Sequence, residues 1–171
     1  MPLTPQAIYR DYITGQLDKK FATELLITLI DNAENIETRI ESISILNKVK
    51  VTDDKTFEFL EHLLISDLNE DVRNLTISVL RTQYLDRAVG PMIWAIEHEK
   101  SLKCLISIVL TIGEIDTFDA KGVLIKTLKK LWKSVDNSIL QYNSEGKNLE
   151  NLPNSELADI LINYYVISFL K

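Results

Sequence analysis

The sequence predicts an all-α fold in which antiparallel pairs of helices stack as an α-solenoid, and three observations lead to this prediction. Apolar residues recur at helical spacing, as in the row Leu124, Leu128 and Leu131. No stretch alternates apolar and polar residues over the length of a strand, and no Asn-Gly or Asp-Gly dipeptide marks a hairpin turn. A similar helical segment also returns about every 30 to 36 residues, which is typical of repeats built from two helices.

Capping residues and the apolar periodicity place about nine helices along the chain. Thr4, which a proline follows, predicts the start of the first helix. Asn35 and Asn69 each precede a helical turn that carries acidic residues, whose charge suits a helix start. Gly15 and Gly113 stand where helices are expected to end. The expected helices cover residues 5–14, 17–31, 36–50, 54–66, 70–83, 87–98, 100–113, 118–142 and 155–170.

The helical segment that begins at Asn35 aligns with two segments further along the chain. It can be placed over the segment that begins at Asn69, and that segment can in turn be placed over the one that begins at Glu99. In this register Arg39, Arg73 and Lys103 coincide, and so do Leu46, Leu80 and Leu110. The helix at 103–113 is apolar nearly all the way round, so that it needs neighbours on both sides to cover it.

The segment Leu64–Leu80 resembles the turn and second helix of a HEAT repeat. Asp67 occupies the turn, and Val72 and Arg73 open the second helix. The resemblance covers about residues 17–113 and implies a right-handed solenoid whose second helices line the concave side. It also implies a ladder of contacts between charged residues of stacked repeats, formed by Asp67, Arg73, Arg39, Glu97 and Lys103.

The remainder of the chain is expected to continue the same array. Residues 118–171 form a divergent C-terminal helix pair around a loop at 143–154, and residues 1–171 are expected to form a single domain. The last helix, 155–170, lacks the polar outer face of a capping repeat, so we expect that this helix can mediate self-association.

Composition narrows the kinds of partner and the compartment. The chain has 171 residues and a net charge of −6, which argues against nucleic acid as the main partner. No apolar run approaches the ~20 residues that span a bilayer, so no transmembrane segment is predicted. Cys104 is the one cysteine, so no intrachain disulfide can form, which fits a cytoplasmic location.

An enzyme is the alternative that the resemblance leaves open, either a metal-dependent hydroxylase or a bilin-lyase-like protein. Hydroxylases of this family bind two irons through His-Glu pairs at equivalent repeat positions. Here His62 and His98 are not equivalent in the repeat register, and Cys104 has no neighbouring histidine. The sequence therefore predicts no metal, no cofactor and no catalytic residue.

The sequence instead favours a protein–protein interaction module or scaffold. Three lysines, at 126, 130 and 133, share one helical face opposite the leucine row, and they could meet an acidic partner. Aromatic and arginine residues are the side chains that most often dominate binding energy at interfaces. The candidate partner-binding residues are Trp94, Tyr84, Arg81, Tyr165, Lys126, Lys130 and Lys133.

Overall fold

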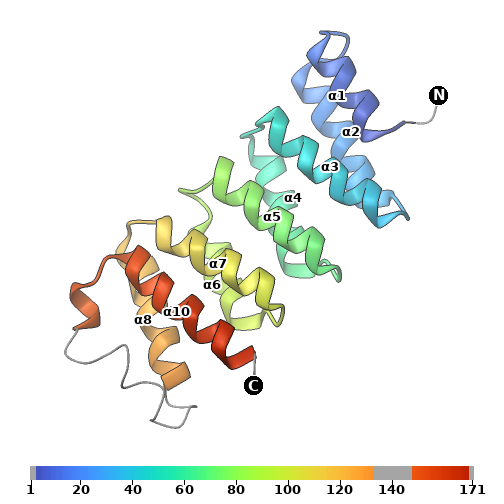
Figure 1. Cartoon of the computed structure of the whole chain (residues 1–171). Coiled ribbons are helices and arrows are strands. Elements are labelled where there is room, and N and C mark those ends of the chain that lie inside the picture. The colour runs from blue at the N-terminus through green and yellow to red at the C-terminus, as the bar shows by residue number, and fades with distance from the viewer. Residues whose placement is uncertain (1–2, 133–147, 170–171) are drawn as a thin grey trace. The chain divides into compact units, whose positions relative to one another are not determined.

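The structure is a computed structural model that describes residues 3–132 and 148–169. Throughout these ranges the regular elements are helices, which confirms the all-α prediction (Figure 1). Three expectations fall wholly or partly outside the described residues: the end of the helix expected at 118–142, residues 143–147 of the loop expected at 143–154, and Lys133.

The chain divides into two compact units, Met1–Tyr84 and Leu85–Lys171. The first unit contains α1 (Pro5–Ile13), α2 (Lys19–Asn32), α3 (Ile36–Val49), α4 (Asp54–Ser66) and α5 (Glu70–Gln83). The second unit contains α6 (Val89–His98), α7 (Leu102–Glu114), α8 (Phe118–Trp132), the short 3-10 helix η1 (Leu149–Asn151) and α10 (Asn154–Phe169).

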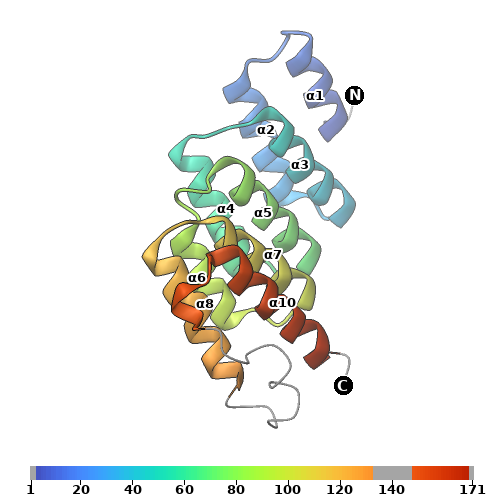
Figure 2. The same cartoon turned by 60° about the vertical axis from the view of Figure 1, so that its left-hand side comes forward.

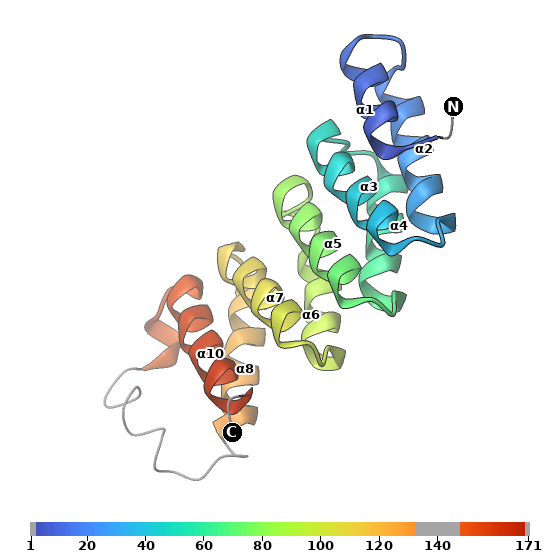
Figure 3. The same cartoon turned by 45° about the vertical axis from the view of Figure 1, so that its right-hand side comes forward.

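The helices of the first unit lie in two layers. In one layer α3 lies between α1 and α5, and the other layer contains α2, which packs on α3, and α4, which packs on α5 (Figure 3). Side chains at helical spacing meet between the layers, and each fully buried leucine or isoleucine contributes about 1.5–3 kcal/mol. The fully buried members are Leu26, Ile30, Ile43, Leu46, Leu60, Ile77 and Leu80.

Two helices of the first unit, α3 and α5, begin in the same way. The Asn35 side chain accepts a hydrogen bond from the Glu37 amide at 2.7 Å, and the Asn69 side chain accepts one from the Asp71 amide at 2.9 Å. Each bond satisfies an amide that has no partner inside its helix. Both caps lie where the sequence predicts them.

The end of α1 requires a glycine. Gly15 has a φ of 76°, a conformation that glycine adopts without steric cost. The Gly15 amide donates to the Tyr12 carbonyl at 3.1 Å, and the Gln16 amide donates to the Asp11 carbonyl at 2.8 Å. This pair of bonds is the Schellman motif, and it confirms the helix end predicted at Gly15.

In the second unit, α7 and α10 lie side by side, and α6 and α8 form the other layer (Figure 2). A Cβ atom added at Gly113 would lie 2.6 Å from the Ala158 Cβ, so only glycine allows α7 and α10 to approach this closely. α7 ends at Glu114, one residue after the helix end predicted at Gly113. Asn154, which is buried, donates from Nδ2 to the Ile115 carbonyl at 2.7 Å and joins α10 to the end of α7.

The structure corrects the repeat register between α5 and α7. Asn69 caps α5 and Ser101 caps α7, so Asn69 is equivalent to Ser101 rather than to Glu99. The same shift aligns Asp67 with Glu99. The Asp67 carboxylate accepts a hydrogen bond from the Asn69 amide, and the Glu99 carboxylate accepts one from the Ser101 amide.

Burial supports the corrected register. Leu80 is fully buried, and its equivalent in this register, Ile112, is 1% exposed, whereas Leu110 is half-buried. The alignment of Arg73 with Lys103 is therefore wrong. Because α7 is apolar on most sides, a slip of two residues still places apolar residues over apolar ones, and only the polar turn residues reveal the register.

Candidate interaction surface on α6 and α8

Of the charged residues expected to link repeats, Arg39 and Asp67 form a contact between α3 and the turn before α5. Arg39, on α3, pairs through Nη2 with the Asp67 carboxylate in the turn before α5, and its Nε donates to the Ile30 carbonyl at 2.6 Å. The side chains are 19% and 7% exposed, so solvent screens this pair little. Arg73 donates from Nη1 to the Asp67 and Leu68 carbonyls at 2.8 and 3.1 Å. These residues stabilise the fold and leave no opening for a ligand.

The charged pair expected in the second unit has a different arrangement. Glu97, at the end of α6, forms its ion pair with Lys126 of α8, with 2.9 Å between Oε1 and Nζ. Lys103 is exposed on α7, two residues away from the position equivalent to Arg73 in the corrected register. Glu97 therefore connects first helices of neighbouring pairs, α6 and α8.

Two of the aromatic residues expected to contact a partner are buried. Tyr84 is 4% exposed, its ring centroid lies 5.4 Å from that of Phe57, and its hydroxyl donates to the Asp53 carbonyl at 3.3 Å. Tyr165 is 8% exposed, and burial raises the pKa of its hydroxyl. Neither ring has a surface for a partner to contact, and we withdraw both from the candidate set.

Trp94 remains a candidate because 40% of its surface is exposed. Its indole stacks on the imidazole of His98, one helical turn later on α6, with 4.1 Å between the ring centroids and 12° between the planes. The Nδ1 atom of His98 lies 2.7 Å from the Trp94 carbonyl, so this nitrogen is assigned the proton. The stack holds the indole in one orientation, which lowers the entropy lost when a partner covers it.

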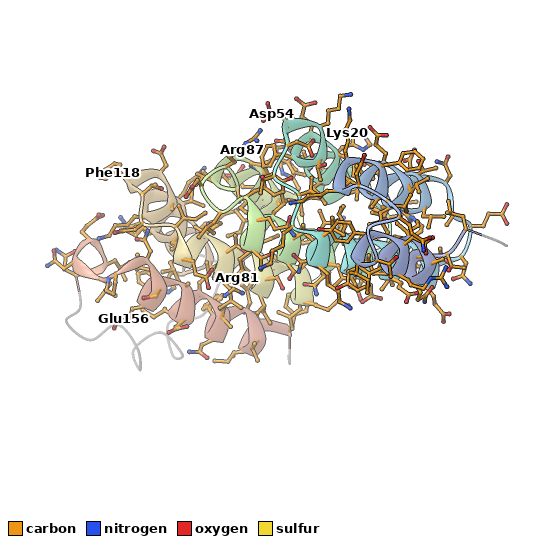
Figure 4. The ribbon with its side chains drawn as sticks, turned by 90° about the horizontal axis from the view of Figure 1, so that it is seen from above. Lys20, Asp54, Arg81, Arg87, Phe118 and Glu156 are labelled. Carbon is orange, nitrogen blue, oxygen red and sulfur yellow. The ribbon has the colours of Figure 1, made fainter. Side chains whose placement is uncertain are left out.

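Arg81 also keeps an accessible side chain but belongs to the other unit. It is half-buried on α5 of the first unit (Figure 4). The retained candidates Trp94, Lys126 and Lys130 all belong to the second unit, where α6 packs against α8. Lys126 pairs with Glu97, which follows Trp94 by three residues on α6, so the retained candidates lie on the two contacting helices of the second unit.

The lysines of α8 lie beside two acidic residues. Lys126 pairs with Glu97, and the hydrogen bond and charge of that lysine lower the pKa of the Glu97 carboxyl. Lys129 lies 3.9 Å from Glu150 of η1. Lys130 is exposed and forms no salt bridge with any residue in the two described ranges. The surface thus holds the exposed Lys130, whose charge also acts on the Glu97 carboxyl, and two lysines in exposed pairs that a partner carboxylate can exchange.

A groove with a volume of about 710 Å³ runs along the same side of α8. Phe118, at the first position of α8, is 89% exposed and projects away from the ribbon (Figure 4). Among the aromatic rings of the described residues it is the most exposed, so a partner that covers it removes apolar area from water. The groove is lined by Phe118, Gly122, Ile125, Lys126, Lys129, Lys130 and Glu150.

Sequence reasoning missed Phe118, although the sequence contains the pattern that locates it. Residues 118, 122, 126 and 130 are four apart, so they share one face of a helix, and that face holds the lysines. Phe118 lies two positions before Ala120, the first buried residue of α8, and so points away from the core. We define the α8 surface as Trp94, Glu97 and His98 of α6 together with the residues that line the groove.

Two hollows in the first unit are lined by side chains that indicate a ligand less clearly than those of the groove on α8. One, of about 580 Å³, lies between the start of α2 and the start of α4, and its rim carries cations and anions in equal number. Lys20 and Asp54 mark this rim on one edge of the unit (Figure 4). The other, of about 440 Å³, lies between α1 and α3. The residues that line these two hollows include no aromatic ring as exposed as Phe118.

The histidine, cysteine and acidic side chains bear on the alternative of a metal-dependent enzyme. Within residues 3–132 and 148–169, no three His, Cys, Asp or Glu side chains are grouped closely enough to hold a metal ion. His62 is exposed on α4, with Nδ1 3.3 Å from the Ser66 hydroxyl, and Cys104 is fully buried in α7.

Two expectations about the surface concern membranes and self-association. Among the helices of the described residues, none has both the length and the apolar character needed to cross a bilayer. On α10, Ile167 is 39% and Phe169 is 52% exposed. Self-association through this helix stays a prediction, which light scattering can test.

Comparison with known proteins yields no relative from which a role could be transferred. The chain matches no protein-family model, and no curated protein and no solved structure is significantly similar to it.

Proposed function

We propose that this protein is a HEAT-like helical-repeat module, without catalytic activity of its own, that binds another protein through the α8 surface. The recurring turn supports the repeat. Ala33, Asp67 and Glu99 each follow a helix end, and each donates its amide to the carbonyl four residues earlier. Two residues after each of these, Asn35, Asn69 and Ser101 occupy the N-cap of the next helix. A turn that recurs at a nearly constant spacing is what an array of stacked helix pairs requires.

The observation that carries the proposed binding role is the exposure of Phe118 beside three lysines. Aromatic residues in shallow pockets dominate the energetics of many protein interfaces, and surrounding charged residues set specificity and the rate of association. Trp94 adds a second exposed aromatic ring on α6, the helix whose Glu97 pairs with Lys126 of the groove. These two exposed rings and the lysines of α8 are the proposed anchor for an extended or helical segment of a partner.

The charge of this surface favours an acidic protein segment as the ligand. Lys126, Lys129 and Lys130 line the groove against the single carboxylate of Glu150. Nucleic acid is disfavoured because the whole chain carries a charge of −6.

A metal-dependent or bilin-lyase-like enzyme remains the alternative of another class. Nothing in the described part of the chain groups the side chains that such metal chemistry needs. Metal analysis and an absorption spectrum of the purified protein separate the two classes. Stoichiometric iron or a visible chromophore would contradict the binding module.

The direct test of the binding role is selection of a short-peptide library displayed on phage against the intact chain. We expect enriched peptides to bind the unchanged protein and to lose binding to the double variant Phe118→Ala, Lys130→Glu. The matched control is Leu68→Ala, Lys20→Glu in the first unit, where Leu68 is 98% exposed and Lys20 is exposed. Failure to enrich peptides, or equal losses in the two double variants, would refute the proposal.

A further inference from the structure

Gly122 is one of the residues that line the groove, lies inside α8, and has no close packing in the described fold that requires a glycine. A Cβ atom added at this position would meet no atom within 4 Å. Glycine destabilises a helix interior relative to alanine, because its backbone loses more freedom on folding. At Gly113 close packing against Ala158 explains the glycine, but at Gly122 no packing does.

The missing side chain leaves a shallow seat on α8. Phe118 lies one helical turn before Gly122 and Lys126 one turn after it, and Lys130 lies one further turn along the same face. Gly122 thus forms a floor between an exposed aromatic ring and the lysines. A glycine in a helix lets another chain approach the backbone closely.

We propose that this seat receives one apolar side chain of an acidic partner segment, whose carboxylates bind Lys126, Lys129 and Lys130. The inference rests on the proposed function and adds the chemistry of the partner. The apolar side chain packs between Phe118 and Ile125, which also lines the groove. Lys130 is about 12 Å from Gly122 along the helix, from the rise of about 1.5 Å per residue. The acidic residues of the partner therefore follow its apolar residue by one to two helical turns, or by about four residues in extended chain.

The two exposed pairs on this surface are compatible with such binding. The Glu97 and Lys126 side chains are 48% and 72% exposed, and Glu150 and Lys129 are 63% and 58% exposed. Exposed pairs hold their partners weakly, so a partner carboxylate can replace Glu97 or Glu150 with little loss. Affinity is then expected to fall as ionic strength rises.

The test uses three synthetic peptides of equal length and the intact chain. The first contains glutamate and serine around one central leucine, the second has serine at the centre, and the third has lysine in place of glutamate. Binding of each labelled peptide is measured by fluorescence polarisation. We expect the first peptide to bind roughly tenfold or more tightly than either of the others.

Two variants test whether the first peptide binds at Gly122. Gly122→Leu fills the seat without a clash and is expected to weaken the first peptide roughly tenfold or more, with an unchanged or higher Tm. Gly90→Leu is the matched control, because Gly90 is an exposed glycine of α6 with equally open surroundings, and it is expected to leave the affinity unchanged.

The outcomes separate the inference from the proposed function. Equal affinity for the first two peptides, or equal affinity of the Gly122→Leu variant and the unchanged chain, overturns the seat. Library peptides that still map to Phe118 and Lys130 leave the proposed function standing in that case. Absence of any peptide that maps to this surface overturns both.

Discussion

The two units of this chain use similar helix pairs and repeated turns but differ in what they do with their charged residues. In the first unit the Arg39–Asp67 pair is mostly buried and joins successive helix pairs. In the second unit the Glu97–Lys126 pair lies on the surface beside exposed aromatic rings. The same types of charged side chain therefore stabilise the fold in one unit and remain accessible to a partner in the other.

The two units also differ in their turns and caps. The first unit caps α3 and α5 with Asn35 and Asn69, and the turn before α5 supplies Asp67 to the pair with Arg39. The second unit departs from the pattern in a shorter α6, an N-cap at Ser101 without a side-chain hydrogen bond, and a glycine inside α8. Two of these departing elements, α6 and α8, carry the surface that we propose for binding.

The largest expected effect tests whether Leu80 and Ile112 are equivalent positions of the repeat. Leu80→Ala in the first unit and Ile112→Ala in the second are each expected to cost ~2–5 kcal/mol in the free energy of unfolding, because both side chains are fully buried. Leu110→Ala is expected to cost less than half as much, since Leu110 is half-buried. Urea denaturation measures all three. A larger loss for Leu110 than for Ile112 would restore the alignment of Leu80 with Leu110.

The next effect compares the two ion pairs. Arg39→Gln removes the pair with Asp67 and the bond to the Ile30 carbonyl, and is expected to cost about 1.5–3 kcal/mol. Glu97→Gln is expected to leave stability unchanged, because water competes for both exposed side chains. Thermal melts at low and high salt provide the measurement, and equal losses for the two variants would remove the contrast between the units.

A third prediction compares two glycines of the second unit. Gly113→Ala forces a methyl group against Ala158 and is expected to destabilise by about 1–3 kcal/mol. Gly122→Ala adds a methyl group in open space and is expected to stabilise by about 1 kcal/mol. The two substitutions are chemically identical, so opposite shifts of Tm isolate packing from helix propensity. Shifts of the same sign would show that the approach of α10 to α7 is looser than the structure describes.

The smallest expected effect is a loss of stability at acidic pH that depends on Asp53. Burial alone would raise the pKa of Asp53, but the hydrogen bonds that its carboxylate accepts from Thr56 and nearby amides outweigh it and hold the pKa below 3.8. The unfolded chain then binds the proton more readily, so the stabilisation is present at neutral pH and is lost as pH falls below that value.

Hydrogen exchange checks this acid sensitivity in both units. Amides in the first turn of α4 are expected to lose protection as pH falls below 3.8, after correction for the intrinsic exchange rate, whereas those of α6 are not, because Ala88 provides no side-chain cap. Asp53→Asn keeps the cap and is expected to abolish the difference, and Asp53→Ala is expected to cost ~1 kcal/mol at neutral pH. Persistence of the acid effect in Asp53→Asn would contradict this cause.

The sequence alone predicted the helices and several of their caps, because these depend on local chemistry. Periodic apolar residues mark a buried face, and Thr4, Asn35 and Asn69 make the cap bonds that their side chains predict. The register of α7 could not be predicted in this way, because its apolar surface fits its neighbours equally well after a slip of two residues.

The candidate site depended on packing between helices, which local patterns do not reveal. Tyr84 follows a helix end and was expected at the surface, but it folds back onto Phe57. Tyr165 lies on the side of α10 that is buried. Phe118 was not expected to be exposed, although it shares the lysine row of α8. A comparison of the face of α8 that carries the lysines with the face that carries the buried residues would have identified Phe118 as exposed.

The most direct test of the central claim is an amide chemical-shift map of the intact chain, recorded with a library-selected peptide. The binding account predicts that shifts concentrate on residues 118–130 of α8 and on residues 94–98 of α6. It also predicts that these shifts disappear in the Phe118→Ala, Lys130→Glu variant. Shifts concentrated on the helices of the first unit, with α8 unaffected, would contradict it.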